Sequence, residues 1–261
     1  MKYRTLIKGL TVLFALAIIV AGCSKDEEPT PEELQNLSFN SEQVLARVPD
    51  GLKNSDDPQA EDCYSFIESA VDMSDFIDEM EVPDDAFKVS KKSSLAGADT
   101  WRWTWYEYGG QTITLYWTYD EDNSKRYWTM EIQYGSGPRY DFIEAWETKD
   151  GTQGEVIYNF GWAAIYSGEP IEDYEYYYWR YTWTLDNSGA YHLKFGIDSY
   201  NQEYEFDVYY DVLINADGSG SIDYYIYDEL FYAYTWDALG NGTWEYYLGG
   251  ELYMSGTWEA G

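Results

Sequence analysis

Alternation of apolar and polar residues in steps of two dominates the chain from about residue 100 onward. In "TWRWTWYEY", for example, Trp101, Trp103 and Trp105 fall on one side of an extended chain, and the residues between them fall on the other. Successive side chains of a β-strand point to opposite faces, so sustained alternation indicates antiparallel strands with one packed face and one wet face. No helical stretch long enough for a parallel crossover interrupts this pattern. The alternation therefore favours an antiparallel meander.

Glycine, asparagine and aspartate punctuate the alternating segments, as at Asp150-Gly151 and Gly240-Asn241-Gly242. These residues tolerate the positive φ angles of tight hairpin turns. Counting the segments between such turns gives about 11 or 12 strands over residues 100–261. The predicted fold is mainly β: a Trp- and Tyr-rich antiparallel meander, forming either a curved sheet or a partly closed barrel. "YTWTLDNSG" at 181–189 and "YTWDALGNG" at 234–242 echo each other, which is similarity at the level of one hairpin.

Residues 41–90 have helical periodicity and form the predicted short N-terminal helical region. Asp57-Pro58 is a start signal, because Asp57 can cap free N–H groups and Pro58 suits the first helical position. Apolar residues then recur at steps of four and three, which places them on one face of a helix. We expect this stripe to pack on the sheet; it comprises Phe66, Ala70, Met73, Ile77 and Met80.

The first 22 residues are typical of an export signal. Lys2, Arg4 and Lys8 form a basic region, and residues 10–20 form an apolar run of a length expected of a signal peptide. A membrane-spanning helix needs about 20 apolar residues, so this run is too short to span. Residues 1–22 are therefore predicted to be a lipoprotein signal peptide, for the reason that follows.

The signal ends in Val20-Ala21-Gly22-Cys23, which resembles the lipobox of bacterial lipoproteins. The resemblance implies that the Cys23 sulfur is acylated and that Cys23 becomes the mature N-terminus. Several acyl chains on one residue would anchor the protein firmly in the outer-membrane bilayer, because each buried CH₂ contributes roughly 0.8 kcal/mol.

The residues after Cys23 carry a second resemblance. Ser24, Lys25, Asp26, Glu27 and Glu28 are similar to the acidic export signal of surface lipoproteins of Bacteroidota. The chain thus resembles a lipoprotein of that group, and cell-surface display is expected, with the periplasmic face as the alternative. Residues 23–40 as a whole are acidic and proline-containing, which favours a flexible tether.

The net charge argues against one class of binding partner, and the cysteine count leaves one cysteine to interpret. The formal net charge is −32, which argues against nucleic acid, since binding to phosphates depends on Lys and Arg. With Cys23 assigned to lipid, Cys63 is the one remaining cysteine, and we interpret it as a small buried hydrophobic residue.

No residue pattern indicates a metal, a cofactor or a catalytic group. His192 is the only histidine, and "NADGSGSID" at 215–223 fits a hairpin turn better than a calcium loop. A carbohydrate-active enzyme would need two paired carboxylates, and Glu131, Glu144 and Glu147 lie within the aromatic pattern, but nothing singles out a pair. We therefore predict no catalytic residue and a protein that is not an enzyme.

Aromatic excess is the remaining feature, with 29 Tyr and 12 Trp in the chain. Tyrosines on the register opposite the core set could form an exposed surface for a glycan or protein ligand, since Tyr is amphipathic and common at contact surfaces. A periplasmic carrier, holding a lipid or another hydrophobic ligand in a half-barrel cavity, is the second hypothesis, and the paired-carboxylate enzyme is the third. The candidate binding surface comprises Tyr106, Tyr116, Tyr176, Tyr178, Tyr209 and Tyr224.

Overall fold

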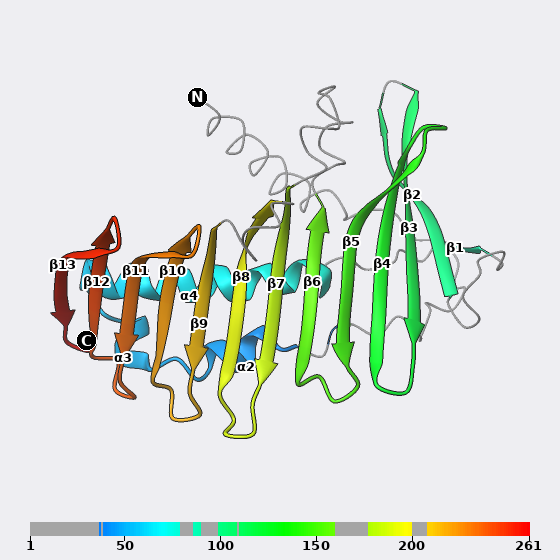
Figure 1. Cartoon of the computed structure of the whole chain (residues 1–261). Coiled ribbons are helices and arrows are strands. Elements are labelled where there is room, and N and C mark those ends of the chain that lie inside the picture. Colours follow the sequence, from blue (N-terminus) through cyan, green and yellow to red (C-terminus); the bar gives the residue numbers. More distant parts are fainter. Residues whose placement is uncertain are drawn as a thin grey trace.

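The structure, a computed structural model, describes residues 37, 39–78, 86–89, 99–108, 110–159, 177–199 and 208–261. Its described strands form one antiparallel sheet in which the order in space is the order in sequence, from β1 to β13 (Figure 1). The strands are β1 (Phe87–Val89), β2 (Asp99–Tyr108), β3 (Gln111–Glu121), β4 (Lys125–Tyr134), β5 (Arg139–Thr148), β6 (Gln153–Asn159), β7 (Tyr177–Leu185), β8 (Tyr191–Ser199), β9 (Val208–Ile214), β10 (Gly220–Ile226), β11 (Glu229–Trp236), β12 (Gly242–Leu248) and β13 (Glu251–Trp258).

The predicted antiparallel meander is confirmed. β1 has only three residues, so the sheet consists essentially of twelve strands and a short edge segment. β1 and β13 stand at opposite ends of the strand order and do not pair, so the sheet is open and the alternative of a partly closed barrel is wrong. Each connection between neighbours is a hairpin or a short loop where the chain is described, which is what the Gly, Asn and Asp turn residues predicted.

Within the described residues three helices precede the sheet: α2 (Ser41–Leu45), α3 (Asp50–Lys53) and α4 (Pro58–Asp78). They lie on one side of it, and α4 runs across the strands behind β6 to β12 (Figure 1). The predicted start of α4 is confirmed, since Asp57 Oδ1 accepts the Gln59 N–H at 2.9 Å. The predicted helical segment reached residue 90, whereas Phe87–Val89 form β1.

The face that α4 presents to the sheet differs from the predicted stripe. Ala60, Cys63 and Ile67 are fully buried, and Ala70 and Val71 continue this line. Phe66 lies at the margin of this face, partly buried, with its ring 5.1 Å from that of Tyr210. The buried line thus follows the smaller residues, which allow the helix to approach an aromatic sheet closely; the side chains of Met73, Ile77 and Met80 lie outside the described part.

Cys63 is confirmed as a buried cysteine. Its side chain has 0% exposure, and burial raises the pKa of its thiol far above the usual range. A thiol in this environment stays protonated and unreactive at neutral pH.

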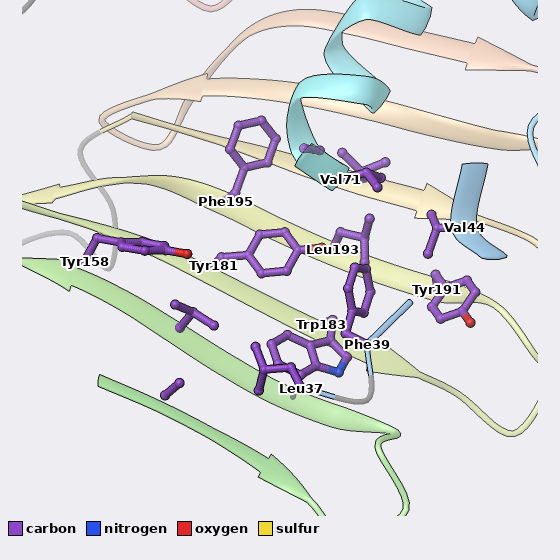
Figure 2. Packing of buried hydrophobic residues seen from close by; sticks show 14 of the residues in the cluster. Leu37, Phe39, Val44, Val71, Tyr158, Tyr181, Trp183, Tyr191, Leu193 and Phe195 are labelled. Carbon is purple, nitrogen blue, oxygen red and sulfur yellow. The ribbon is translucent and has the colours of Figure 1, made fainter. Parts of the chain in front are cut away.

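The prediction of a flexible tether over residues 23–40 is wrong at its C-terminal end. Leu37 and Phe39 fall within its range of 23–40, yet both are buried in the core. The Phe39 ring lies 5.7 Å from Tyr181 and 5.3 Å from Trp183, in a cluster beneath α2 and α4 (Figure 2). An apolar pair at the end of an otherwise acidic segment gains more by burial than the ordering of a few residues costs.

The interior between the helices and β7–β10 is filled with side chains. Val71 of α4 and Val44 of α2 face Leu193 and Phe195 of β8 in the same cluster (Figure 2). The Phe195 and Tyr210 rings stack at 4.7 Å. This part of the molecule is a packed core, so it gives no support to the hypothesis of a carrier with a hydrophobic cavity.

Glycines in the hairpin turns contact the segment that joins α2 to α3 and the backbone of α3 itself. A Cβ on Gly218 would lie 2.6 Å from the Arg47 carbonyl oxygen, and one on Gly240 would lie 2.4 Å from the Leu52 nitrogen. Both glycines have positive φ, 88° and 97°. The Arg47 guanidinium donates to the Gly189 carbonyl as well. The turns thus hold the helices through backbone contacts that a larger residue would block.

Candidate binding surfaces

The predicted tyrosine surface belongs to the outer face, which we define as the face of the sheet opposite the helices. The structure places Tyr116, Tyr178 and Tyr209 there, since their cross-strand partners are residues of the polar register. Tyr178 is half-buried. Tyr176 lies outside the described residues, as do Cys23 and the export signal Ser24, Lys25, Asp26, Glu27 and Glu28. Of Tyr106 only the backbone is described, and it pairs with Ile113 after a bulge in β2.

Tyr116 is on the predicted face, but the prediction that it is exposed is wrong. Its side chain is only 6% exposed because the Arg139 guanidinium lies 3.5 Å above its ring. Arg139 also pairs with Glu131 at 3.1 Å, and the Tyr116 hydroxyl donates to Gln133 at 2.7 Å. A cation therefore already covers the ring face on which a sugar would stack.

Tyr209 is covered in the same way and is 8% exposed. The Lys194 ammonium lies 4.2 Å from its ring centroid, and Tyr225 of the neighbouring strand stacks on it at 4.7 Å. Burial, followed by the charge of Asp228, raises the pKa of Tyr209 to about 12. The Cα and Cβ of Tyr209 also lie close to Gly196, where an added Cβ would approach the Tyr209 Cβ at 2.6 Å. Its place is structural.

Tyr224 lies on the opposite face from the one predicted. Its partners in register are Tyr210 and Tyr232, and its ring stacks on Tyr210 at 4.5 Å, on the side of the sheet that carries the helices. Tyr224 and Tyr225 are adjacent in sequence, so the alternation alone was compatible with either of them pointing outward. The structure turns Tyr225 outward, where it meets Tyr209.

The three acids considered for an enzyme do not share a cleft. Glu147 is fully buried on the helix side, where the Arg126 guanidinium binds it at 2.9 Å. Glu144 is three residues earlier on the same strand and so points to the outer face, where burial and the charges of Asp141 and Glu155 raise the pKa of its carboxyl. Glu131 is in the ion pair with Arg139. A pair of carboxylates acting on one bond cannot be built from Glu144 and Glu147.

Metal ligation finds no support in the described residues either. No group of three or more His, Cys, Asp and Glu side chains among them is arranged to hold a metal ion. His192 contacts Asp186 at 3.2 Å. Residues 215–219 form the turn between β9 and β10, as predicted, with Asp217 Oδ1 accepting the Ser219 N–H at 3.0 Å.

A row of acids crosses the outer face of β9–β12. Asp211 and Asp223 are directly opposite each other, with Lys194 beside the first and Glu245 two strands beyond the second. Desolvation raises the pKa of both aspartates; the charges of Asp211 and Glu245 raise that of Asp223 further, whereas Lys194 partly opposes the rise at Asp211. Like charges in directly opposed cross-strand positions destabilise a sheet.

We expect Asp223→Asn to stabilise the protein at pH 7, by about 0.5–1 kcal/mol, because it removes one of these opposed charges. The folded-state pKa of Asp223 is raised, so the cost of its charge appears as pH rises through that pKa and is absent below the unfolded pKa. The gain in Tm, about 2 °C at pH 7, should therefore vanish at about pH 3.

Asp217→Asn is the matched control for this measurement. Hydrogen bonds from Ser219 lower the pKa of Asp217, so its charge stabilises the fold above the unfolded pKa and that stability is lost as pH falls. This variant should be destabilised at pH 7. Equal Tm changes of the same sign in the two variants would contradict the account of the acid row.

Three tryptophans of the described strands make the same two contacts at hairpin turns. Each indole lies over a glycine at the start of a neighbouring strand, where a Cβ would lie 2.0–2.4 Å from the ring atoms. Each indole N–H also donates to a turn glycine carbonyl: Trp183 to Gly151 at 3.3 Å, Trp236 to Gly218 at 2.8 Å and Trp258 to Gly240 at 2.7 Å. The echo between 181–189 and 234–242 has this physical basis, since Trp183 and Trp236 have the same role.

The last two of these units are repeats of each other. Gly218 and Gly240 are 22 positions apart, and so are Trp236 and Trp258. The bulges repeat as well: Phe231 in β11 and Tyr253 in β13 are the unpaired residues of the two ladders, again 22 positions apart. β13 is therefore the structural counterpart of β11.

The two counterparts differ in what covers them. In β11, Tyr246 of β12 packs on Phe231 at 5.1 Å and on Tyr232 at 4.9 Å, and the β11 residues are half-buried. β13 is the last strand of the sheet, and its equivalents of these residues are exposed. Together with Leu248 at the end of β12 (56% exposed), they form what we call the C-terminal edge patch, which comprises Leu248, Leu252 (54%), Tyr253 (63%) and Met254 (50%).

Charge is distributed unevenly around this patch. Residues 208–261, which contain β9–β13, include nine Asp and Glu and no Lys, Arg or His; Lys194 is the last basic residue of the chain. Glu245, Glu251 and Glu259 are nearest in sequence to the patch. The surface at this end of the sheet thus combines exposed apolar side chains with negative charge alone.

No protein-family model matches the sequence, and a search of curated proteins finds no match. None of the helices within the described residues is long and apolar enough to cross a membrane. Sequence reasoning did not identify the C-terminal edge patch. The signal was present as the 22-residue spacing of Gly and Trp, which marks β13 as a strand built like an internal one.

Proposed function

We propose that this chain is a lipid-anchored protein of the bacterial outer membrane, displayed at the cell surface, that binds another protein through its C-terminal edge patch. The observation that carries the binding role is the exposure of Tyr253 and Met254, whose counterparts in β11, Phe231 and Tyr232, are covered by Tyr246 of a further strand. Contiguous exposed apolar residues on a soluble surface typically mark an interaction site.

A protein ligand is favoured over a glycan because of what covers the outer face. Glycan binding by a sheet relies on open aromatic faces, but Arg139 covers Tyr116 and Lys194 covers Tyr209. The edge patch instead offers aliphatic and aromatic side chains beside an unpaired strand edge, which suits recognition by main-chain pairing.

The anchoring role rests on the sequence around Cys23. The lipobox of residues 20–23 and the acidic residues 24–28 support attachment to the outer membrane and export to its outer surface. Leu37 and Phe39 are buried, so the free tether between the lipid and the folded body would be about a dozen residues long, enough to hold the acidic domain clear of an anionic surface.

We expect Cys23→Ser to move the protein from the membrane fraction to the soluble fraction, because a serine hydroxyl cannot replace the sulfur that carries the lipid. The measurement is fractionation of cells followed by immunoblotting. Cys63→Ala is the matched control, because Cys63 is buried in α4 and carries no lipid in this proposal. This variant should stay in the membrane fraction. Retention of Cys23→Ser in the membrane would contradict the anchoring role.

Binding through the patch is tested on intact cells with a photo-crosslinking residue at position 253 and, as a control, at position 239. Leu239 is also exposed, at 71%, but lies in the turn between β11 and β12. We expect a discrete protein adduct from position 253 and none from position 239. Identical patterns from the two positions, or no adduct from either, would rule out a binding role for the patch.

A further inference from the structure

We propose that the ligand of the C-terminal edge patch is an extended, lysine- or arginine-bearing segment of another protein, which adds to β13 as a further antiparallel strand. This inference rests on the proposed function and specifies the chemistry of the partner. It is drawn from three features of the described residues: the repeat that relates β13 to β11, the open edge of β13, and the charge of β9–β13.

The repeat shows what kind of structure fits the patch. β12 covers β11 as an antiparallel strand, pairing Tyr246 with Tyr232 and Trp244 with Tyr234. Met254 is the β13 equivalent of Tyr232, by the same spacing of 22 residues. A strand that placed an aromatic side chain opposite Met254 would bury Met254 and Tyr253 as Tyr246 buries Tyr232 and Phe231.

The edge of β13 is available for such pairing. Proteins usually block the edges of their sheets with lysine, proline or a bulge, because the unpaired N–H and C=O groups of an edge strand can hydrogen-bond to a strand of another chain. β13 contains neither lysine nor proline. Its bulge lies at Tyr253, near its beginning, and Met254–Trp258 keep regular pairing with β12. Strand addition at an edge of this kind is an established mode of peptide recognition.

Charge decides between the candidate partners. A second copy of the chain would bring together two edges that carry Glu245, Glu251 and Glu259 and no basic residue, within a protein of net charge −32. Like charges placed side by side oppose association, and complementary charges favour it. A strand that carries Lys or Arg would meet this negatively charged end of the sheet with opposite charge, so the partner is basic and is not a second copy.

The test uses the lipid-free protein that begins after Cys23 and a fluorescein-labelled peptide of about ten residues that alternates Lys with Tyr and Val. A second peptide replaces each Lys by Glu. We expect the Lys peptide to bind, measured by fluorescence anisotropy, and the Glu peptide to bind at least about tenfold more weakly. Raising NaCl from 50 mM to 500 mM should weaken the Lys peptide about tenfold.

Tyr253→Lys and Met254→Lys should each weaken binding of the Lys peptide about tenfold or more, whereas Leu239→Lys, with the same change in charge at an exposed leucine outside the patch, should change it less than about twofold. Circular dichroism melting of each variant shows whether it is folded. No binding of the Lys peptide at 1 mM, or equal binding of the two peptides, overturns the inference.

Two further outcomes separate this inference from the proposed function. A dimer in light scattering that Met254→Lys abolishes would make a second copy the partner, which overturns the basic strand but retains the patch as a protein-binding site. A specific adduct at position 253 on cells, without binding of the Lys peptide, would likewise retain the proposed function and reject the basic strand as its ligand.

Discussion

Arg126→Met is expected to lower the free energy of unfolding by about 3 kcal/mol, the largest loss that we expect from a single change in the sheet. The Arg126 guanidinium binds Glu147 Oε1 at 2.9 Å, and the Glu147 side chain has no exposure to solvent. The variant would leave a buried carboxylate without this cation. Removing one partner of a buried ion pair is far more costly than removing one partner of an exposed pair, because water does not replace the lost charge.

Lys149→Met provides the comparison for this variant. Lys149 pairs with Glu121 at 3.3 Å on the same part of the sheet, but both side chains are well exposed, 39% and 51%. We expect a loss below about 0.5 kcal/mol. Urea denaturation of both variants measures the difference, and the double variant Arg126→Met with Glu147→Leu should recover much of the stability. Equal losses in Arg126→Met and Lys149→Met would refute the view that burial sets the cost.

Gly242→Ala is expected to cost about 2–3 kcal/mol, because the added methyl group would lie 2.0 Å from Cζ2 of Trp258. The indole would have to move, and its 2.7 Å hydrogen bond to the Gly240 carbonyl would stretch or break. Trp258 is 3% exposed, so it has no open space to move into. A thermal melt should show the loss directly.

The cause can be separated from ordinary glycine effects. Gly249 has nothing within 4 Å of an added Cβ and a φ of 61°, so Gly249→Ala should cost only about 1 kcal/mol from backbone strain. Phenylalanine lacks the ring atoms that would clash, so Trp258→Phe and Gly242→Ala together should cost less than the sum of the two single variants. Strict additivity would mean that the indole is not what excludes a side chain at position 242.

The strands were predictable because each buries one face, and burial of one face imposes a period of two that is legible in the sequence. Bulges set the limit of this reasoning. An extra residue in one strand reverses the face of every residue after it, and no local pattern marks the bulges at Phe231 and Tyr253. Tyr224 was assigned to the wrong face for a related reason, because Tyr225 beside it fits the alternation equally well.

The candidate surface was less predictable than the fold, since its state depends on neighbours that are distant in sequence. Tyr116 was correctly placed on the outer face, but Arg139, which covers it, is on a strand two positions away in the sheet. Exposure at β13, in turn, depends on the strand being last in the order. The 22-residue spacing of glycine and tryptophan could have shown which residues a further strand would cover.

The contact between the helices and the hairpin turns has a consequence for the time course of folding. Neighbouring strands of the meander are close in sequence, so the sheet can form by a series of short loop closures, which are fast. Docking of the helical segment instead joins residues that are far apart in sequence. The Gly261 N–H, for example, donates to the Gly51 carbonyl at 3.2 Å. The contact of Gly51 with Gly261 can form only after the last hairpin has formed, which makes completion of helix docking the natural final step of folding.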